Sequence, residues 1–393
     1  MSAKAPWLTI IGLGEDGPDG LTPASHAALA AAEIVTGPPR HLALLPDSAT
    51  MRVEWPVPFA DGIPLLLEHR GRPTVMLASG DPFWFGAGTS VTQHLEPGEW
   101  TAHPGPSTFS LIAARLGWPL ERTSCLGLHA APLTRLQPHL APGQRIITTL
   151  RDGDAVHAAA RTITELGFTA DLTVCEAMGG PRERVSAYTP DATYTHPVAL
   201  ALTCTAGPAM PKASGLPDDV FETDGQITKR PVRALTLSAL APRPGEHLWD
   251  IGGGSGSIAI EWLLAHPTLT ATSIEPRTDR AARIRANAAR LGVDHLQVAE
   301  GTAPKALAGL PAPDVVFIGG GLSDALLAHV ATLPKGTRLV ANAVTLETEA
   351  LLTAAHAAHG GDLLRIELAH AAPLGPRTGW KPSYPIVQWS VTL

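Results

Sequence analysis

The glycine-rich run at residues 250–257 constrains this chain more than any other feature. It reads Asp-Ile-Gly-Gly-Gly-Ser-Gly-Ser and follows an apolar segment that ends at Trp249. Glycines let a strand turn sharply into a helix, whose N-terminus then offers free N–H groups to a bound molecule. Glu275 ends the next apolar run, close to the spacing of about 20 residues at which nucleotide-binding folds place a carboxylate on a ribose. The run therefore predicts a site for a nucleoside-containing cofactor.

Two such cofactors are compatible with the run. Residues 254–259 fit the dinucleotide pattern G-x-G-x-x-A. Asp250, however, lies inside the turn, where its carboxylate would repel a pyrophosphate and attract the sulfonium and ammonium groups of S-adenosylmethionine (SAM). The succession of strands and helices after the run is also typical of SAM-dependent methyltransferases. We expect SAM, with a dinucleotide or a purely structural glycine turn as the alternatives.

The composition excludes several classes of protein. A length of 393 residues favours two or three domains, and a net charge of −7 argues against general affinity for nucleic acid or an anionic membrane. The chain has neither a signal-peptide pattern nor an apolar run of about 20 residues that could span a bilayer. Its three cysteines and sixteen histidines are scattered without metal-ligand spacing. We expect a cytoplasmic enzyme without a metal site.

The C-terminal part alternates between strands and helices. We expect strands at residues 246–251, 269–275, 296–299, 314–318 and 338–343, with helices from 231, over 277–291 and over 346–356. Two further strands, 363–370 and 386–391, close the chain without a helix between them. This order predicts a Rossmann-like α/β sheet that binds ligands at the carboxyl ends of its strands.

The N-terminal part alternates as well, and a Pro- and Gly-rich segment at residues 205–224 separates the two parts. Its expected strands are 7–11, 74–78, 146–150, 172–176 and 198–204, and a helix should start at Thr22-Pro23. Glycine-containing turns follow successive strands, and together they predict one cleft. These turns occupy residues 12–14, 78–82, 103–108 and 177–181.

The motifs of both parts resemble known families. Ile11-Gly12-Leu13-Gly14, Leu77–Pro82, Pro104–Ser107 and Glu176–Pro181 resemble the tetrapyrrole (class III) methyltransferases. The C-terminal part looks like the decarboxylating precorrin methyltransferases, through Gly225–Lys229, the glycine-rich run, Glu300–Pro304, Phe317–Gly321 and Asn342–Glu347. The fusion in this order is similar to the bifunctional C5,15-methyltransferases (decarboxylating) that act on precorrin-6Y in cobalamin biosynthesis.

The resemblance implies a function and a domain plan. Residues 1–206 would form a two-lobed tetrapyrrole methylase domain that methylates meso carbon 5, and residues 207–224 a linker. Residues 225–393 would form a Rossmann-like, seven-stranded SAM domain that methylates meso carbon 15 and removes the acetate carboxyl of ring C, giving precorrin-8. It also implies a homo-oligomer.

The resemblance further implies two SAM sites. Carried over residue by residue, the C-terminal site comprises Thr228, Asp250, Gly252, Gly254, Ser255, Gly256, Glu275, Thr302 and Ala303. The N-terminal site comprises Gly12, Gly14, Gly80, Asp81, Ser107 and Met178. Glu15-Asp16 departs from the Pro-Gly that often follows the glycine pair in the family. We therefore expect a ligand of this loop to make few anionic contacts there.

The implied substrate is a large macrocycle that carries several carboxylates, and it needs cationic partners. Arginine and lysine side chains near the expected cleft are the candidates: Lys229, Arg230, Arg233, Arg277, Arg377 and Lys381. Gly319-Gly320-Gly321 after an expected strand leaves room for a flat molecule. Asn342 and His370 are the candidates for a catalytic role in the decarboxylation.

Other functions remain compatible with the sequence. One is a SAM-dependent carbon methyltransferase for another macrocycle, with one domain idle. A second is an NAD-dependent oxidoreductase, because of the near fit to the dinucleotide pattern. A third is a non-catalytic protein that senses SAM. Binding of SAM versus NAD and the mass of the product would distinguish these functions.

Overall fold

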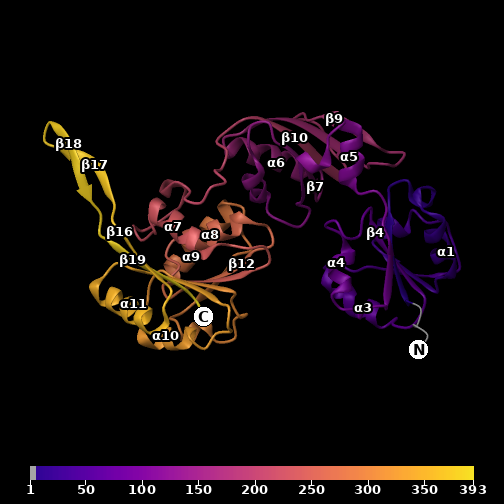
Figure 1. Cartoon of the computed structure of the whole chain (residues 1–393). Helices are drawn as coiled ribbons and strands as arrows, with labels where there is room; N and C mark the ends of the chain where they lie inside the picture. The colour runs from indigo at the N-terminus through magenta and orange to yellow at the C-terminus, as the bar shows by residue number, and fades with distance from the viewer. Residues whose placement is uncertain (1–5) are drawn as a thin grey trace. The chain divides into compact units, whose positions relative to one another are not determined.

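The computed structural model describes residues 6–393, which fall into two compact units. The first unit extends to Pro208 and the second begins at Ala209 (Figure 1). Within the described residues, no helix is both long and apolar enough to cross a membrane, and no three His, Cys, Asp or Glu side chains cluster as metal ligands would.

The first unit contains two five-stranded sheets. The first sheet is parallel, with the order β3-β2-β4-β1-β5. Its strands are β1 (Leu8–Leu13), β2 (Ile34–Gly37), β3 (Met51–Glu54), β4 (Thr74–Ser79) and β5 (Trp100–His103). The second sheet is mixed, with the order β6-β7-β10-β8-β9. Its strands are β6 (Thr123–Gly127), β7 (Arg145–Leu150), β8 (Thr169–Glu176), β9 (Arg184–Ala187) and β10 (Val198–Ala206).

Helices of the first unit begin where the sequence supplies caps. Thr22 accepts a hydrogen bond from the backbone N–H of Ser25, with Pro23 as the first helical residue, as expected. Ser107 caps the fifth helix in the same way, and Gly117 ends it in a left-handed conformation. The helices are α1 (Pro23–Ala31), α2 (Pro39–Leu42), α3 (Gly62–Leu67), α4 (Ala87–Thr92), α5 (Thr108–Leu116) and α6 (Gly153–Glu165).

The second unit is built on one seven-stranded sheet with the order β13-β12-β11-β14-β15-β19-β16. The first five strands are parallel, and the last two pair antiparallel. This is the predicted Rossmann-like sheet with its closing strand pair. The strands are β11 (His247–Ile251), β12 (Thr270–Glu275), β13 (Gln297–Glu300), β14 (Val315–Ile318), β15 (Arg338–Ala343), β16 (Asp362–Ile366) and β19 (Ile386–Thr392).

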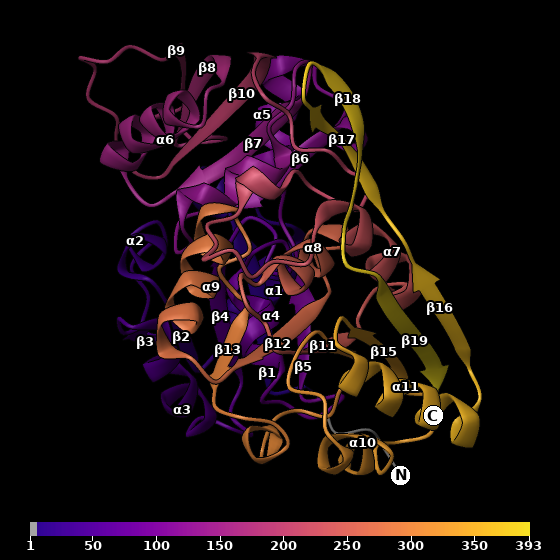
Figure 2. The same cartoon turned by 90° about the vertical axis from the view of Figure 1, so that its left-hand side faces the viewer.

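Helices cover both faces of this sheet (Figures 1 and 2). The helices are α7 (Arg230–Leu240), α8 (Ser257–Ala265), α9 (Thr278–Arg290), α10 (Asp324–Val330) and α11 (Leu346–His359). Alternate residues of the central strands serve the two faces. Leu248 and Phe317 pack with α7, α8 and α9, whereas Trp249 and Ile318 pack with α10 and α11.

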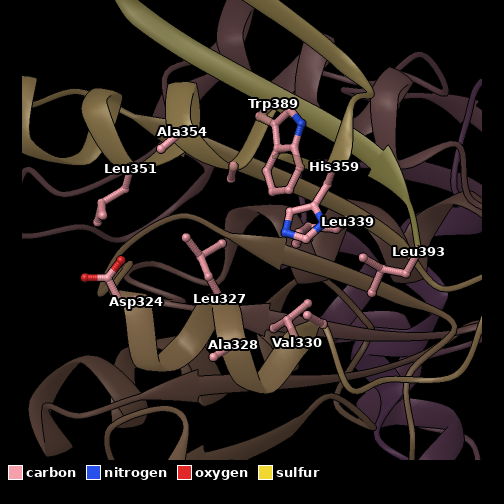
Figure 3. Close-up of a pocket in the computed structure, with 12 residues that line it drawn as sticks. Asp324, Leu327, Ala328, Val330, Leu339, Leu351, Ala354, His359, Trp389 and Leu393 are labelled. Carbon is pink, nitrogen blue, oxygen red and sulfur yellow. The ribbon is translucent and has the colours of Figure 1, made fainter. Parts of the chain in front are cut away.

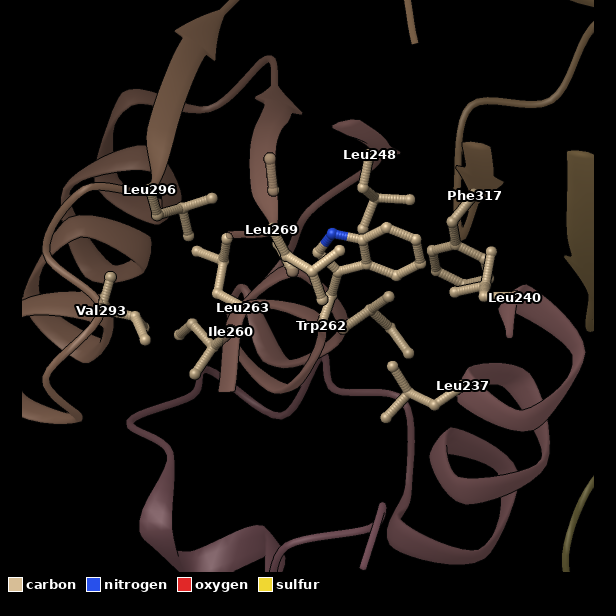
Figure 4. Packing of buried hydrophobic residues seen from close by; sticks show 14 of the residues in the cluster. Leu237, Leu240, Leu248, Ile260, Trp262, Leu263, Leu269, Val293, Leu296 and Phe317 are labelled. Atoms are coloured by element: carbon tan, nitrogen blue, oxygen red, sulfur yellow. The ribbon is translucent and has the colours of Figure 1, made fainter. Parts of the chain in front are cut away.

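Trp262 of α8 lies at the centre of the first of these cores, among the leucines of α7 and β11 (Figure 4). It is fully buried, and its indole N–H donates to the carbonyl of Thr270 at 3.1 Å. Burial of each large apolar side chain stabilises the fold by about 1.5–3 kcal/mol. The core therefore fixes α8, and with it the glycine-rich turn that precedes the helix.

The segment expected to be a linker differs from that expectation. Residues 209–224 belong to the second unit, because Leu216 and Phe221 are buried in its core. Glu261 of α8 accepts hydrogen bonds from the backbone N–H groups of Gly215 and Leu216, at 2.6 and 3.0 Å. The Pro- and Gly-rich composition describes an irregular backbone here, and tertiary contacts hold that backbone in place.

The connection between the last two expected strands is a two-stranded antiparallel ribbon, β17 (Ala369–Leu374) and β18 (Arg377–Pro382). It extends from the main sheet as an arm (Figures 1 and 2). The predicted strand 363–370 therefore ends at Ile366 and a second strand begins at Ala369. Leu374, Trp380 and Tyr384 are at least 70% exposed on this arm and its base.

Candidate functional site

A cavity of about 360 Å³ opens at the carboxyl ends of β11, β12, β14 and β15. The predicted C-terminal residues that line it are Thr228, Lys229, Asp250, Gly252, Gly254, Ser255, Glu275, Thr302, Ala303 and Asn342. The parallel strands bring these positions together, since all their carboxyl ends meet at one edge of the sheet. Gly256 does not line the cavity; it adopts a left-handed conformation just before α8.

The backbone of the glycine-rich turn lies directly against the backbone of the loop that follows β14. Gly252 has a φ of +80°, and a Cβ atom there would lie 2.7 Å from the backbone nitrogen of Gly320. No other residue type fits both the conformation and the space. The two glycine loops, 252–256 and 319–321, therefore form an open floor for the cavity.

Asp250 and Ser255 present unsatisfied polar atoms in this cavity. The Asp250 carboxyl is 1% exposed; its Oδ2 accepts from Ser273 at 3.2 Å, whereas its Oδ1 has no partner. The buried hydroxyl of Ser255 also has none. Burial raises the pKa of Asp250 to about 7. A cation bound beside Oδ1 would supply the missing partner.

Glu275 is the carboxylate at the end of β12. It is 2% exposed, and its two oxygens accept from the backbone N–H groups of Gly254 and Arg277 at 2.9 and 3.1 Å. These bonds fix the carboxylate at the lip of the glycine-rich turn. Each oxygen keeps a further lone pair, so the pair can accept from neighbouring hydroxyls such as those of a ribose.

Arg233 does not take the predicted role. It is fully buried, and its guanidinium donates to Glu261, to Asp218 and to the carbonyls of Leu216 and Thr228. Leu237 and Leu240 follow it by four and seven residues, which places Arg233 on the inner face of α7 and commits it to the core. Arg233 is a structural anchor, and we withdraw it as a substrate ligand.

Other predicted cations also lie outside the cavity lining. Arg230 and Arg277 are on the surface near the cavity, and Arg277 pairs with Asp279 at 2.7 Å. Arg377, Lys381 and His370 are on the exposed ribbon, with His370 and Lys381 opposite each other in register. The sequence placed His370 at the end of the expected strand 363–370 and Arg377 and Lys381 in the connection after it, and it did not show that this connection pairs with residues 369–374 as a ribbon.

Arg280 is a lining residue that the sequence analysis missed. It lies in the first turn of α9, and its guanidinium donates to Asp224 at 2.9 Å. Arg277 and Arg283 approach the same carboxylate, at 3.7 and 3.5 Å. Arg280 lowers the pKa of Asp224 to about 2. The one signal in the sequence was the arginine repeat at 277, 280 and 283, which places three cations near one end of α9.

The predicted glycines of the first unit pack against each other. A Cβ atom on Gly12 would collide with Gly80 and with Gly105, and the N–H of Gly105 donates to the carbonyl of Gly80 at 3.0 Å. Asp81 follows Gly80, and its carboxylate accepts from the N–H of Phe83. The structure therefore brings the ends of β1, β4 and β5 together, as predicted for the turns after these strands.

The remaining predicted residues of the first unit have structural contacts. Ser107 caps α5, and the side chain of Met178 is buried with Phe109 in the core. Gly14 lies against the carboxylate of Asp16, where a Cβ atom would collide with it.

Glu15, the first of the two acids in the loop after the glycine pair, forms ion pairs. Its carboxylate pairs with Arg40 and, at 3.2 Å, with Arg182. Arg40 also donates to the hydroxyl of Ser79 at 2.6 Å. Two guanidinium groups therefore compensate the single carboxylate of Glu15.

A second cavity of the second unit, of about 210 Å³, lies between α10 and α11 (Figure 3). Aliphatic side chains such as Leu327 and Leu351 line most of it, together with His359 and Trp389. It lies on the α10–α11 side of the sheet and holds no predicted site residue.

Comparisons with known proteins agree with this division. The family of tetrapyrrole (corrin/porphyrin) methylases matches residues 7–190, and the precorrin methyltransferase domain family matches residues 219–393. The C-terminal domain of precorrin-6Y C5,15-methyltransferase from Rhodobacter capsulatus is a similar solved structure. It is 55% identical, covers 47% of this chain and 100% of its own, and has a TM-score of 0.46.

Curated relatives match nearly the whole chain. The precorrin-6Y C(5,15)-methyltransferase (decarboxylating) of Sinorhizobium sp is 48% identical over 99% of this chain and 97% of its own length. The protein of the same name from Mycobacterium tuberculosis (strain CDC 1551 / Oshkosh) is 40% identical over 98% and 99%. Since this similarity spans both units, the chain belongs to the precorrin-6Y C(5,15)-methyltransferase (decarboxylating) family.

Proposed function

We propose that this chain uses SAM to methylate a precorrin-6 macrocycle at meso carbons 5 and 15 and removes the acetate carboxyl of ring C, giving precorrin-8. The observation that carries the proposal is the cavity at the strand ends of the second unit, within a chain whose relatives of this name match both units. The names of these relatives supply the reaction, and the cavity supplies a site suited to it.

The residues of the cavity fit SAM. The unpartnered Oδ1 of Asp250 suits a sulfonium or ammonium group, and the lone pairs of Glu275 suit ribose hydroxyls. A pyrophosphate would lie beside the Asp250 carboxyl, which argues against a dinucleotide. Bound SAM supplies a methyl group on a positively charged sulfur.

The chain contributes orientation and exclusion of water to such a transfer. Glu275 and Asp250 hold two parts of one cofactor at neighbouring strand ends. Gly319 to Gly321 leave space above β14 for a flat acceptor, because they carry no side chains. No lining residue needs to abstract a proton before methylation, since the conjugated macrocycle itself makes the carbon nucleophilic.

Cationic side chains at and near the cavity are consistent with a substrate that carries several carboxylates. Lys229 and Arg280 line the cavity, and Arg277 and Arg283 lie beside Arg280 around the single carboxylate of Asp224. We propose Lys229 and Arg280 as the substrate ligands of the second unit. Charge reversal of Lys229 should raise KM for the macrocycle more than KM for SAM.

We assign methylation at carbon 15 and decarboxylation to the second unit, and methylation at carbon 5 to the first, with one SAM site in each. The strand exits brought together around Gly80 and Asp81 support a site in the first unit. The test compares two variants by mass spectrometry of the product. Gly252→Ala should abolish methylation at carbon 15 together with carbon dioxide release, and Asp81→Ala should abolish only methylation at carbon 5.

The unchanged chain is the control for both variants. With a precorrin-6 substrate and SAM, its product should gain two methyl groups and lose one carbon dioxide. A product that keeps all its carboxyl groups, or variants that lose the same methyl group, would contradict the assignment.

We also propose that the chain self-associates through the ribbon. A lone two-stranded ribbon is marginally stable in water, yet this one exposes Leu374 and Trp380 by 70% and 77%. A second copy of the chain would cover these side chains. Trp380→Ser should lower the molar mass measured by light scattering, whereas the same change at Trp84, which is 37% exposed in the first unit, should not.

A further inference from the structure

Asn342 is held by two buried polar side chains behind the cavity. It lies on β15 directly opposite Gln388 of β19 in the antiparallel register. The Asn342 Nδ2 donates to the hydroxyl of Thr236 at 2.9 Å, and the Gln388 Nε2 donates to the Asn342 Oδ1 at 2.9 Å. The Gln388 Nε2 also donates to Thr236, at 3.1 Å. We call these three residues the Asn342 network.

The Asn342 network puts polar side chains at a buried position where apolar side chains could pack and stabilise the fold. Thr236 is fully buried on α7 next to Leu237, and Gln388 is 4% exposed on β19 between Val387 and Trp389. A buried polar group that loses its partner costs about 1–3 kcal/mol. Buried side chains that hydrogen-bond to one another instead hold one geometry firmly. The benefit of this arrangement is therefore a fixed orientation of Asn342.

The hydrogen bonds leave part of the Asn342 carboxamide free. An asparagine has two N–H donors and an oxygen with two lone pairs. Thr236 takes one donor and Gln388 takes one lone pair. Rotating the amide by half a turn would place the Nδ2 of Asn342 against the Nε2 of Gln388, donor against donor. One N–H therefore remains in a defined direction on a side chain that lines the cavity.

The position of Asn342 on the sheet places it in the part of the cavity where the molecule that accepts the methyl group would bind. Strand β12, which carries Glu275, is separated from β15 by β11 and β14. Neighbouring strands lie about 4.8 Å apart, so the two strands are about 14 Å apart. If SAM binds with its ribose at Glu275 and its sulfonium and ammonium groups at Asp250 on β11, its methyl group lies between Asp250 and β15. Asn342 then lies beyond this methyl group, where the macrocycle would enter.

We propose that Asn342 binds the macrocycle by donating its free N–H to an acceptor atom of the substrate, and that Gln388 and Thr236 are positioning residues that aim this donor. The inference rests on the proposed function and deepens it. No proton is transferred. The network orients the substrate toward the donor of the methyl group, and misplacement by about 1 Å can lower such a rate about 100-fold.

A double-mutant cycle on the full-length chain tests this inference. Asn342→Ala and Gln388→Leu should each lower the rate of carbon dioxide release at saturating SAM by about 10- to 100-fold. The double variant should be no slower than Asn342→Ala alone, because Gln388 acts only through Asn342. In all three variants the Kd for S-adenosylhomocysteine should stay within about twofold of that of the unchanged chain, since the residues proposed to bind the cofactor, Asp250 and Glu275, are unchanged.

Thr236 gives a second route if Gln388→Leu fails to fold. Thr236→Val keeps the shape and removes the hydroxyl, so it should lower the rate, and Thr236→Ser should restore it. The matched control is Thr272→Val. Thr272 is 1% exposed and bonds to the Nε2 of His247 at 3.2 Å, outside the cavity lining. This variant should keep the full rate, even where it lowers the melting temperature.

Three results would overturn the inference. Additive losses in the double variant would mean that Gln388 has a separate, structural effect. Full activity of Asn342→Ala would remove the donor from the reaction. Absence of carbon dioxide release from the unchanged chain would refute the proposed function and this inference with it. In that case S-adenosylhomocysteine binding would still report whether the cofactor site exists.

Discussion

At the scale of single residues, Asp250 decides how the site responds to pH. Its carboxyl has a pKa of about 7, raised by burial, so it is largely neutral below that pH. A bound cation pairs only with the ionised form. We expect the affinity for SAM to fall about tenfold for each pH unit below the pKa and to level off above it. Calorimetric titration with SAM on both sides of this pH measures the effect.

Asp250→Asn is the variant for this prediction. It should weaken SAM binding above the pKa and remove the pH dependence. The same raised pKa means that the folded chain holds a proton that the unfolded chain releases above its ordinary pKa of 3.8. Stability therefore falls as pH rises from that value to about 7. Asp250→Asn should consequently melt at a higher temperature than the unchanged chain above pH 7, and an equal or lower melting temperature would contradict the burial argument.

At the scale of elements, the buried pair of Arg233 and Glu261 ties three segments together. It joins α7, α8 and residues 215–218. Removing one partner of a buried ion pair costs about 3–5 kcal/mol, because the other charge stays buried and unpaired. Arg233→Met should lower the free energy of unfolding of the second unit by about that amount. Denaturant titration measures it.

The matched control for Arg233→Met is Arg365→Met. Arg365 forms an ion pair with Glu367 on the surface at 2.9 Å, and its side chain is 56% exposed. Exposed pairs contribute about 0–1 kcal/mol, so this variant should unfold almost as the unchanged chain does. Equal losses in the free energy of unfolding for the two variants would show that burial does not increase the contribution of the Arg233 ion pair.

At the scale of the whole molecule, the boundary between the units determines which fragments fold. A fragment from Ala209 keeps Leu216 and Phe221 in the core of the second unit, whereas a fragment from Gly225 loses both. We expect only the longer fragment to unfold cooperatively and to release carbon dioxide from the substrate. Thermal melting and the carbon dioxide assay on both fragments measure this, and equal stability would contradict the contribution of residues 209–224.

The sequence by itself determined the order of strands and helices, the glycine-rich turn and the residues at the strand ends, because glycine conformation and apolar periodicity are local properties. Glu275 could be placed for the same reason, since it ends a strand, whereas Asp250, predicted inside the turn, is the penultimate residue of β11. Only the tertiary structure decided the roles of Arg233 and Arg280, and it alone paired Asn342 with Gln388. Such roles depend on which distant segments pack together: the fold buries Arg233 against Glu261, turns Arg280 toward the cavity, and brings the last strand beside β15.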